Sequence, residues 1–235
     1  MIHHGKRGLG KIIFVTGTDT GVGKTLLAGL LLYHLRVEGC HALGMKPFCC
    51  GSLDDVKLLQ AAQSNELTLD EINPFYFPKP VAPLAAARDR RDRQRAVRMS
   101  DALEKIRCLE KKCERLVIEG CGGLLVPLGA GYTVADLIRE LNCSVVVVGR
   151  NKLGTINHTL LTARTLKEMR AEDLKIVLME QRKGDFSCKT NRIILASLLG
   201  KPVVEFPFLH ENRKGFATLE NIHKKVKKTL ARILE

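Results

Sequence analysis

The sequence contains no tryptophan, and no apolar run approaches the roughly 18 residues that a membrane-spanning helix needs. The longest apolar stretches are Leu26–Leu35 and Cys143–Gly149. Residues Met1–Lys11 lack the apolar core of a signal peptide. Eight cysteines in 235 residues, none with C-x-x-C spacing, are too sparse for a disulfide scaffold and do not indicate a zinc or redox site. We therefore expect a soluble, cytoplasmic protein, with most cysteines acting as small buried apolar residues.

Acidic residues are also scarce, because 25 Asp and Glu face 38 Lys and Arg, which leaves a net charge of +13. Such a balance suits nucleic acid, an anionic membrane surface or small anionic ligands, and does not choose among them. Two short segments, Arg88–Arg98 and Lys224–Glu235, each carry a net charge of +4. Because charge runs are commonly solvated surface, we expect no nucleic-acid partner and no membrane partner.

Apolar, β-branched runs alternate with longer segments of helical periodicity, which is typical of a parallel sheet covered by helices. We predict an α/β fold, a doubly wound and mostly parallel sheet in a single domain over residues 1–235. The expected strands are Ile12–Thr16, Ala42–Lys46, Arg115–Glu119, Ser144–Val148, Leu174–Met179 and Val203–Phe206. The expected helices are Lys24–Val37, Asp54–Gln63, Ser100–Cys113, Thr133–Leu141, Asn157–Met169, Ser187–Leu199 and Ala217–Leu234. The proline-rich segment Asn73–Pro83 is expected to be an extended connection.

The strongest motif is the segment Phe14–Thr25, FVTGTDTGVGKT, in which a strand ends in a glycine-rich turn and a helix begins. Backbone N–H groups in such a turn converge on phosphate, and the helix N-terminus adds a favourable dipole. The strict template G-x-x-x-x-G-K-[ST] is not met, since its first position falls on Thr18 and the glycine is Gly17. We predict a variant phosphate loop of a nucleotide-binding protein, with contacts from Gly21, Val22, Gly23, Lys24, Thr25 and Leu26.

Two carboxylates follow strands whose ends should lie beside this loop. Glu119 ends an apolar strand before a Cys-Gly-Gly sequence that includes Gly122, and Asp55 begins the helix after the second strand. Thr25, Asp55 and Glu119 together would offer the oxygen ligands that Mg²⁺ prefers. The alternatives are an ordinary surface carboxylate for Glu119 and a first-turn helix residue for Asp55.

Lys46, at the end of the second strand and directly before Pro47, is a further candidate. A lysine fixed at this edge could stabilise negative charge that develops on a substrate. On position alone, a solvated lysine at a strand end is an equal alternative.

Taken together, the motifs of this sequence resemble those of the dethiobiotin synthetases, a family of phosphate-loop NTPases. The resemblance runs in order through nearly the whole chain, in the blocks GTDTGVGKT (17–25), MKPFCCGS (45–52), INPFYFPKPVAP (72–83), VIEGCGGLLVPL (117–128), VVGRNKLGTINHTLLT (147–162) and EFPFLHEN (205–212).

The resemblance implies that 7,8-diaminononanoate, carbon dioxide and ATP are converted to dethiobiotin, ADP and phosphate, through a carbamate that ATP phosphorylates. It implies roles for Lys46 at the carbamate and γ-phosphate, and for Lys24 and Thr20 at the same anionic cluster. Thr25, Asp55 and Glu119 would hold Mg²⁺.

The resemblance further implies a homodimer with the active site at the interface. Gly154, Thr155 and Asn157 match the block that reaches the partner's substrate carboxylate, and Cys50 stands where Ser or Thr touches the substrate. Glu180 and Gln181 replace an Asn-Asp pair beside adenine, Gly21 replaces a common Glu, and the stretch from Lys46 to Asp55 is short. The other adenine-side segment is matched by Pro207, Phe208 and Leu209.

Two other readings stay open. The related phosphate loop and the basic segments are compatible with a partition-type ATPase that binds DNA or membrane. Cys50 and the short loop are compatible with a related synthetase that acts on another diamine or amino acid.

Overall fold

The structure, a computed structural model, describes residues 9–88, 96–171, 173–209 and 217–235. Its centre is a six-stranded parallel sheet in the order β10-β9-β8-β1-β5-β2. The strands are β1 (Ile12–Gly17), β2 (Ala42–Met45), β5 (Arg115–Glu119), β8 (Ser144–Arg150), β9 (Leu174–Met179) and β10 (Val203–Phe206). All six strands expected from the sequence are therefore confirmed, as is the α/β fold class.

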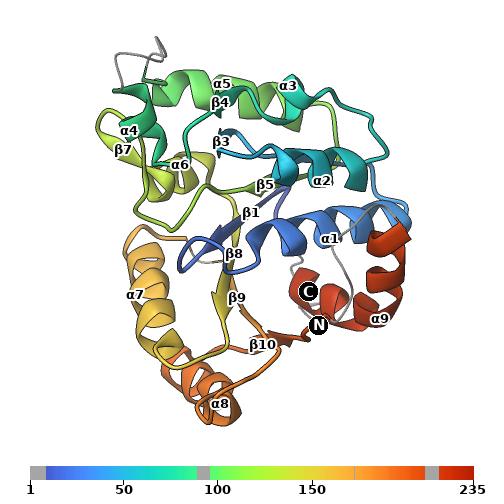
Figure 1. The fold of residues 1–235 in the computed structure, drawn as a ribbon, viewed down its shortest axis with the longest axis vertical. Coiled ribbons are helices and arrows are strands. Elements are labelled where there is room, and N and C mark those ends of the chain that lie inside the picture. The colour runs from blue at the N-terminus through green and yellow to red at the C-terminus, as the bar shows by residue number, and fades with distance from the viewer. Residues whose placement is uncertain (1–8, 89–95, 172, 210–216) are drawn as a thin grey trace, which may run out of the picture.

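Helices cover both faces of this sheet because its strands are apolar on both sides. Every residue of β1 is buried, and the four valines of β8 have no exposed surface. Helices α1 (Lys24–Val37) and α9 (Ala217–Leu234) lie on one side, and α7 (Thr155–Glu168) and α8 (Cys188–Leu199) lie on the other (Figure 1). Helix α2 (Asp54–Ala62) packs against α1, and α5 (Met99–Glu110) contacts α6 (Val134–Leu141).

The strand order reverses at β1. The chain leaves β1 for β2 at one edge, returns to β5, and then crosses to β8 on the other side of β1. In open α/β sheets, ligands bind at such a reversal, outside the carboxyl ends of the strands. The segments that follow β1, β2, β5 and β8 are therefore placed around one site.

Short elements that the sequence did not predict form an additional layer beside the sheet. Strand β3 (Phe48–Cys50) pairs in parallel with β4 (Phe75–Phe77), and the rings of Phe48 and Phe75 stack at 5.2 Å. The segment Asn73–Pro83 is thus only partly an extended connection, since it contains β4 and the first residue of a helix. The remaining short elements are α3 (Leu69–Ile72), α4 (Pro83–Ala87), β6 (Pro127–Gly129) and β7 (Tyr132–Thr133).

Helix boundaries differ from the expectation where a cap decides them. Helix α7 begins at Thr155 rather than Asn157, because Gly154 adopts φ 92° and turns the chain into the helix. Helix α6 begins after Thr133, whose side chain and that of Asp136 form a reciprocal capping box.

The cysteines only partly follow the expectation of burial. All eight are free thiols, but only Cys49 and Cys113 are buried, and Cys108 is exposed. Cys108 lies on the outer face of α5, so helical position decides its exposure.

The structure describes one of the two basic segments fully and the other only in part. Residues 89–95 of Arg88–Arg98 lie outside the described residues. All of Lys224–Glu235 except the last residue belongs to α9, which buries Val226, Leu230 and Ile233 against the fold. In the part of the chain that the structure describes, no helix is long and apolar enough to cross a membrane.

Candidate active site

The phosphate loop connects β1 to α1 at the reversal of the sheet. Gly21 and Gly23 adopt φ values of 69° and 107°, which favour glycine. A Cβ atom added to Gly17 would lie 2.8 Å from Cγ2 of Val22 and 3.1 Å from the Asp19 carbonyl oxygen. The tight turn therefore requires glycine at position 17. This position lies one residue before the first glycine of the strict template, which falls on Thr18.

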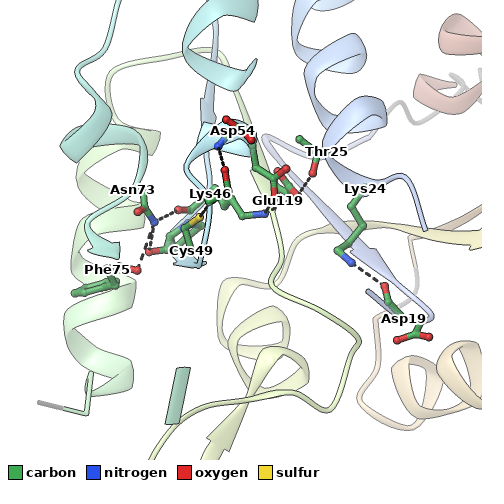
Figure 2. A network of polar contacts seen from close by, with 12 residues as sticks. Asp19, Lys24, Thr25, Lys46, Cys49, Asp54, Asn73, Phe75 and Glu119 are labelled. Atoms are coloured by element: carbon green, nitrogen blue, oxygen red, sulfur yellow. Dashed lines mark hydrogen bonds and ion pairs between the residues drawn. The ribbon is translucent and has the colours of Figure 1, made fainter. Parts of the chain in front are cut away.

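Lys24 lies over this loop, where its Nζ donates to the carbonyl oxygen of Asp19 at 2.8 Å (Figure 2). Its side chain is buried, and burial lowers the pKa of Lys24 below its ordinary value, although the charge of Glu119 acts in the opposite direction. Thr20 is exposed at the tip of the loop, and its backbone N–H donates to Oδ1 of Asp19 at 2.6 Å.

Four predicted site residues that lie apart in the sequence meet in one polar network beside the loop: Thr25, Lys46, Asp55 and Glu119. Nζ of Lys46 donates to Oδ2 of Asp55 at 2.8 Å and to Oε1 of Glu119 at 2.7 Å. Oγ1 of Thr25 donates to the same oxygen of Glu119 at 2.6 Å. Figure 2 shows Lys46, Glu119 and Thr25 converging at this point.

Burial gives this network its electrostatic character. Burial of Lys46 lowers its pKa, but Glu119 and Asp55 outweigh that effect, and the pKa of Lys46 is raised overall. Burial also raises the pKa of Asp55, yet the charge and hydrogen bond of Lys46, helped by Thr25, hold it below its usual value. Lys46 is only 5% exposed, so the alternative of a solvated lysine is wrong for its position.

The network has the ligand chemistry of a magnesium site. The donors are a hydroxyl and two carboxylates, and Oε2 of Glu119 is buried without a hydrogen-bond partner among the described residues. That open oxygen fits a hard cation. The described residues contain no group of three or more His, Cys, Asp and Glu side chains that could hold an ion alone. A magnesium ion here would therefore be coordinated by phosphate oxygens as well as by these side chains, as is usual for nucleotide sites.

The backbone of Lys46 is fixed by a segment that the sequence analysis did not connect with it. The Lys46 N–H donates to the Ile72 carbonyl at 2.9 Å, and Nδ2 of the buried Asn73 donates to the Lys46 carbonyl at 2.8 Å. Asn73 is thus a positioning residue that the sequence analysis missed, although the Asn-Pro pair at 73–74 offered a signal.

Cys50 lies close to Cys121, which the sequence did not single out. The two thiols are hydrogen-bonded to each other, and this bond, with burial, raises the pKa of Cys50. The same bond lowers the pKa of Cys121 to about 7, with help from the charges of Lys46 and Lys24. The charge of Lys46 acts to lower the pKa of both thiols.

The start of α7 forms a small pocket with the phosphate loop. It is lined by Thr18, Asp19, Thr20, Val22, Arg150, Lys152, Thr155 and His158. Gly154 and Asn157 are exposed, whereas the Thr155 side chain is buried and lies 3.5 Å from Oγ1 of Thr159. Arg150, which the sequence analysis missed, donates from Nη2 to the Gly21 carbonyl at 2.7 Å and so links β8 to the loop.

The expected base-side residues lie at the ends of β9 and β10, beyond the loop. A hollow of about 500 Å³ is lined by Glu180, Cys188, Lys189, Glu205, Pro207 and Thr229. Of the five expected residues, Glu180 and Pro207 line it, whereas Gln181, Phe208 and Leu209 do not. The Gln181 side chain instead donates to the Met179 carbonyl at 2.7 Å. Gly23 connects this region to the loop, because a Cβ atom there would lie 3.1 Å from the Met179 methyl carbon.

Comparison with known proteins agrees with this arrangement. A family model described as an AAA domain matches residues 11–214. A ParA family ATPase from Chlorobium tepidum has a similar structure, with a TM-score of 0.56 and 12% identity over 96% of this chain and 97% of that one. The latter likeness concerns the fold alone. With the loop geometry, these matches define a phosphate-loop ATPase.

Closer relatives specify the family. The chain is 39% identical over 194 residues to the ATP-dependent dethiobiotin synthetase BioD of Akkermansia muciniphila, covering 81% of this chain and 88% of the relative. It is 38% identical over 201 residues to that of Bacillus licheniformis, covering 83% and 84%. It is 44% identical over 159 residues to that of Anaeromyxobacter dehalogenans, covering 66% and 70%. The chain belongs to the dethiobiotin synthetase family.

Proposed function

We propose that this protein carboxylates 7,8-diaminononanoate and closes the ring to dethiobiotin, at the expense of ATP. The observation that carries the proposal is the network in which Lys46 bridges Asp55 and Glu119 while Thr25 joins Glu119 to the phosphate loop. It supports the proposal because a buried cation and side chains able to hold Mg²⁺ lie beside the loop that would bind the phosphates. The names of the relatives supply the product, dethiobiotin, and the use of ATP, and the substrate diamine is the one that the family resemblance implies.

The chemistry calls for charge stabilisation rather than a protein nucleophile. One substrate amine captures carbon dioxide as a carbamate, a carbamate oxygen attacks the γ-phosphorus and ADP departs. The second amine then attacks the resulting mixed anhydride and releases phosphate as the cyclic urea forms. Negative charge accumulates on the carbamate and on the transferring phosphoryl oxygens, so a fixed ammonium group stabilises each transition state.

We assign the chain's residues to these steps. Lys46 binds the carbamate and the γ-phosphoryl oxygens, and Lys24 and Thr20 bind the same phosphates. Lys24 would exchange the Asp19 carbonyl for a phosphate oxygen, which is a stronger, charge-assisted acceptor. Bound magnesium would neutralise phosphate charge and align the γ-phosphoryl group, and Thr25, Asp55 and Glu119 would hold it. The remaining contacts of the loop come from Gly21, Val22, Gly23, Leu26 and Gly122.

The substrate side is proposed to involve a second copy of the chain. Gly154 and Asn157 are exposed at the start of α7 and are available to a partner's substrate carboxylate. The Thr155 side chain is buried and its backbone N–H donates to the Lys152 carbonyl at 3.1 Å, so we expect Thr155 to position the exposed residues beside it. Cys50 would lie along the substrate, near the carbamate.

A direct assay tests the proposal. Purified protein with ATP, Mg²⁺, bicarbonate and 7,8-diaminononanoate is expected to release phosphate and form dethiobiotin in equal amounts, followed by mass spectrometry. ATP turnover that is indifferent to the diamine would contradict the proposal. Turnover stimulated by another diamine alone would favour a related synthetase, and salt-sensitive, ATP-dependent binding to duplex DNA would favour a partition-type ATPase.

A further inference from the structure

Arg150 is the last residue of β8, and its side chain reaches across to the phosphate loop. Nε and Nη2 both donate to the carbonyl oxygen of Gly21, at 3.1 and 2.7 Å. The strand end that carries this side chain is itself fixed, because Arg150 pairs with Met179 of β9 and the Asn151 N–H donates to the Met179 carbonyl at 2.9 Å. A guanidinium group on a rigid strand thus holds one carbonyl of the loop with two donors.

The carbonyl that Arg150 holds belongs to a residue that has no side chain to pack. Gly21 is exposed and adopts φ 69°, a conformation that glycine enters freely. On the other side of the peptide bond, the Val22 side chain is buried, and a Cβ atom added to Gly17 would lie 2.8 Å from its Cγ2 atom. The peptide group between Gly21 and Val22 is therefore anchored by packing at one end and by Arg150 at the other.

The two hydrogen bonds from Arg150 set the direction of this peptide group. The described part of the chain contains no cis peptide bond, so the Gly21 C=O and the Val22 N–H point in opposite directions. Within the described residues, the Val22 N–H donates to no partner, and it is therefore available to an anion. If the peptide group turned over, a carbonyl oxygen would face the phosphates in place of this donor.

We infer that Arg150 is a positioning residue, which fixes the peptide group between Gly21 and Val22 so that the Val22 N–H faces the phosphates of the nucleotide. Arginine suits this role because its guanidinium is planar and presents its donors as a rigid fork, whereas lysine carries a point charge on a flexible stem. The inference rests on the nucleotide placement proposed above.

Calorimetry with ATP and Mg²⁺, without the diamine, tests the role. Arg150→Met keeps an unbranched side chain but removes the donors. Its dissociation constant for ATP is expected to rise at least ~10-fold, the scale of one hydrogen bond to a charged group. The matched control, Arg164→Met, changes an exposed arginine of α7 and is expected to keep wild-type affinity. Equal affinities in the two variants would overturn the inference.

The outcome for the proposed function is read separately, on the wild-type protein. ATP binding without formation of dethiobiotin would contradict the proposed function and leave the role of Arg150 to the binding data. A wild-type protein that binds no ATP would overturn both.

Steady-state kinetics separates positioning from a general loss of structure. Because the Val22 N–H would bind phosphate equally in the ground state and the transition state, Arg150→Met is expected to raise the KM for ATP and to leave kcat close to wild type. A fall in kcat with an unchanged KM for ATP would overturn the inference.

The variant Arg150→Lys separates positioning from charge, and it keeps the test valid if Arg150→Met fails to fold. It retains the positive charge without the fork, so it is expected to bind ATP at least ~3-fold more weakly than the wild type. Wild-type affinity in Arg150→Lys would show that charge alone is sufficient and would overturn the positioning role.

A double-mutant cycle shows whether Arg150 acts through the loop peptide. Gly21→Ala disturbs the same peptide group, because a Cβ atom there would lie 3.0 Å from Nη2 of Arg150 at a φ that favours glycine. The loss of ATP affinity in the variant carrying both Gly21→Ala and Arg150→Met is therefore expected to be at least ~3-fold smaller than the product of the single losses. Losses that multiply would show that the two residues act independently, which would overturn the inference.

Discussion

At the scale of single residues, the centre of the site is a lysine held between two carboxylates. Burying an ion costs several kcal/mol unless partners compensate it, and here Asp55 and Glu119 provide that compensation for Lys46. The arrangement keeps the lysine charged and fixed before any substrate arrives. Such preorganised charge is the largest contribution that many active sites make to rate.

Replacing Lys46 by alanine removes the proposed stabilising charge. We expect Lys46→Ala to fold and bind nucleotide but to lose at least ~10²-fold in turnover, measured by dethiobiotin formation and nucleotide calorimetry. Lys57→Ala, which removes an exposed lysine of α2, is the control and is expected to retain activity. Near-native turnover in Lys46→Ala would refute the role.

Glu119 carries the open carboxylate oxygen. Glu119→Gln is expected to raise the Mg²⁺ concentration needed for half-maximal rate by ~10-fold or more, because a neutral amide is a weaker ligand for a hard cation. Titration of Mg²⁺ in the synthetase assay and in nucleotide binding measures the effect. Glu104→Gln, an exposed change on α5, serves as the comparison. If the Mg²⁺ requirement of Glu119→Gln matched that of the control, the assignment as a ligand would be wrong.

At the scale of elements, α9 is fastened to α1 by two histidines. Nδ1 of His34 and Nε2 of His223 lie 2.9 Å apart, and both rings are buried. Burial lowers the pKa of His34 and of His223. The charge of His223 lowers the pKa of His34 further, and the charge of Lys227 lowers that of His223 further. Only one proton can occupy the bond between the nitrogens, so charging both rings forces them apart.

The sign of the resulting pH dependence follows from these lowered pKa values. The unfolded chain binds protons at His34 and His223 near pH 6.5, whereas the folded protein resists them, so stability is present above that pH and falls as the solution is acidified through it. We expect the free energy of unfolding in urea to drop by about 1 kcal/mol or more between pH 7.5 and 5.5.

The variant His223→Gln is expected to flatten this slope, while His158→Gln, at an exposed histidine of α7, is expected to leave it intact. Equal slopes in wild type and His223→Gln would show that other groups control the acid response.

The elements of the central sheet were predictable because each strand is a continuous apolar run, and the phosphate loop because its chemistry is local. Lys46 and Glu119 followed from their places at strand ends, and Asp55 from its place at the start of the helix after the second strand. The hydrogen bond between Cys50 and Cys121 and the anchoring of Glu180 by Asn151 were not predictable, since side chains distant in sequence meet there without a repeating pattern. The β3 and β4 pair was missed because three-residue strands lack periodicity.

At the scale of the whole molecule, the described positive charge lies both on the surface of α9 and in the candidate site. Lys224 and Lys227 on α9 pair with Glu220 and Glu38, so part of the basic C-terminal segment is compensated on the surface. The candidate site instead gathers Lys24 and Lys46 at the sheet reversal.

The proposed dimer predicts that two variants, each weakly active alone, restore activity when they are mixed. Lys46→Ala and Asn157→Ala disable different contributions to a shared site, so each is expected to be weakly active alone. After the two are mixed and allowed to exchange subunits, half of the dimers contain one intact site, and about a quarter of wild-type turnover should return. Mixing without any recovery would mean that each protomer builds its site alone.

Two hydrogen bonds at the backbone of Lys46, one to the Ile72 carbonyl and one from the side chain of Asn73, also bear on how this protein could be engineered. These two bonds hold residue 46 beside residues 72 and 73, close to the ammonium group, so the chain between them forms a closed loop. Because loop length affects the closure entropy only weakly, residues can be added or deleted at the exposed turn 64–66 while Asp55 and Asn73 keep their contacts with Lys46. Insertions at this turn, with Asp55 and Asn73 kept constant, are therefore expected to leave the lysine in its place.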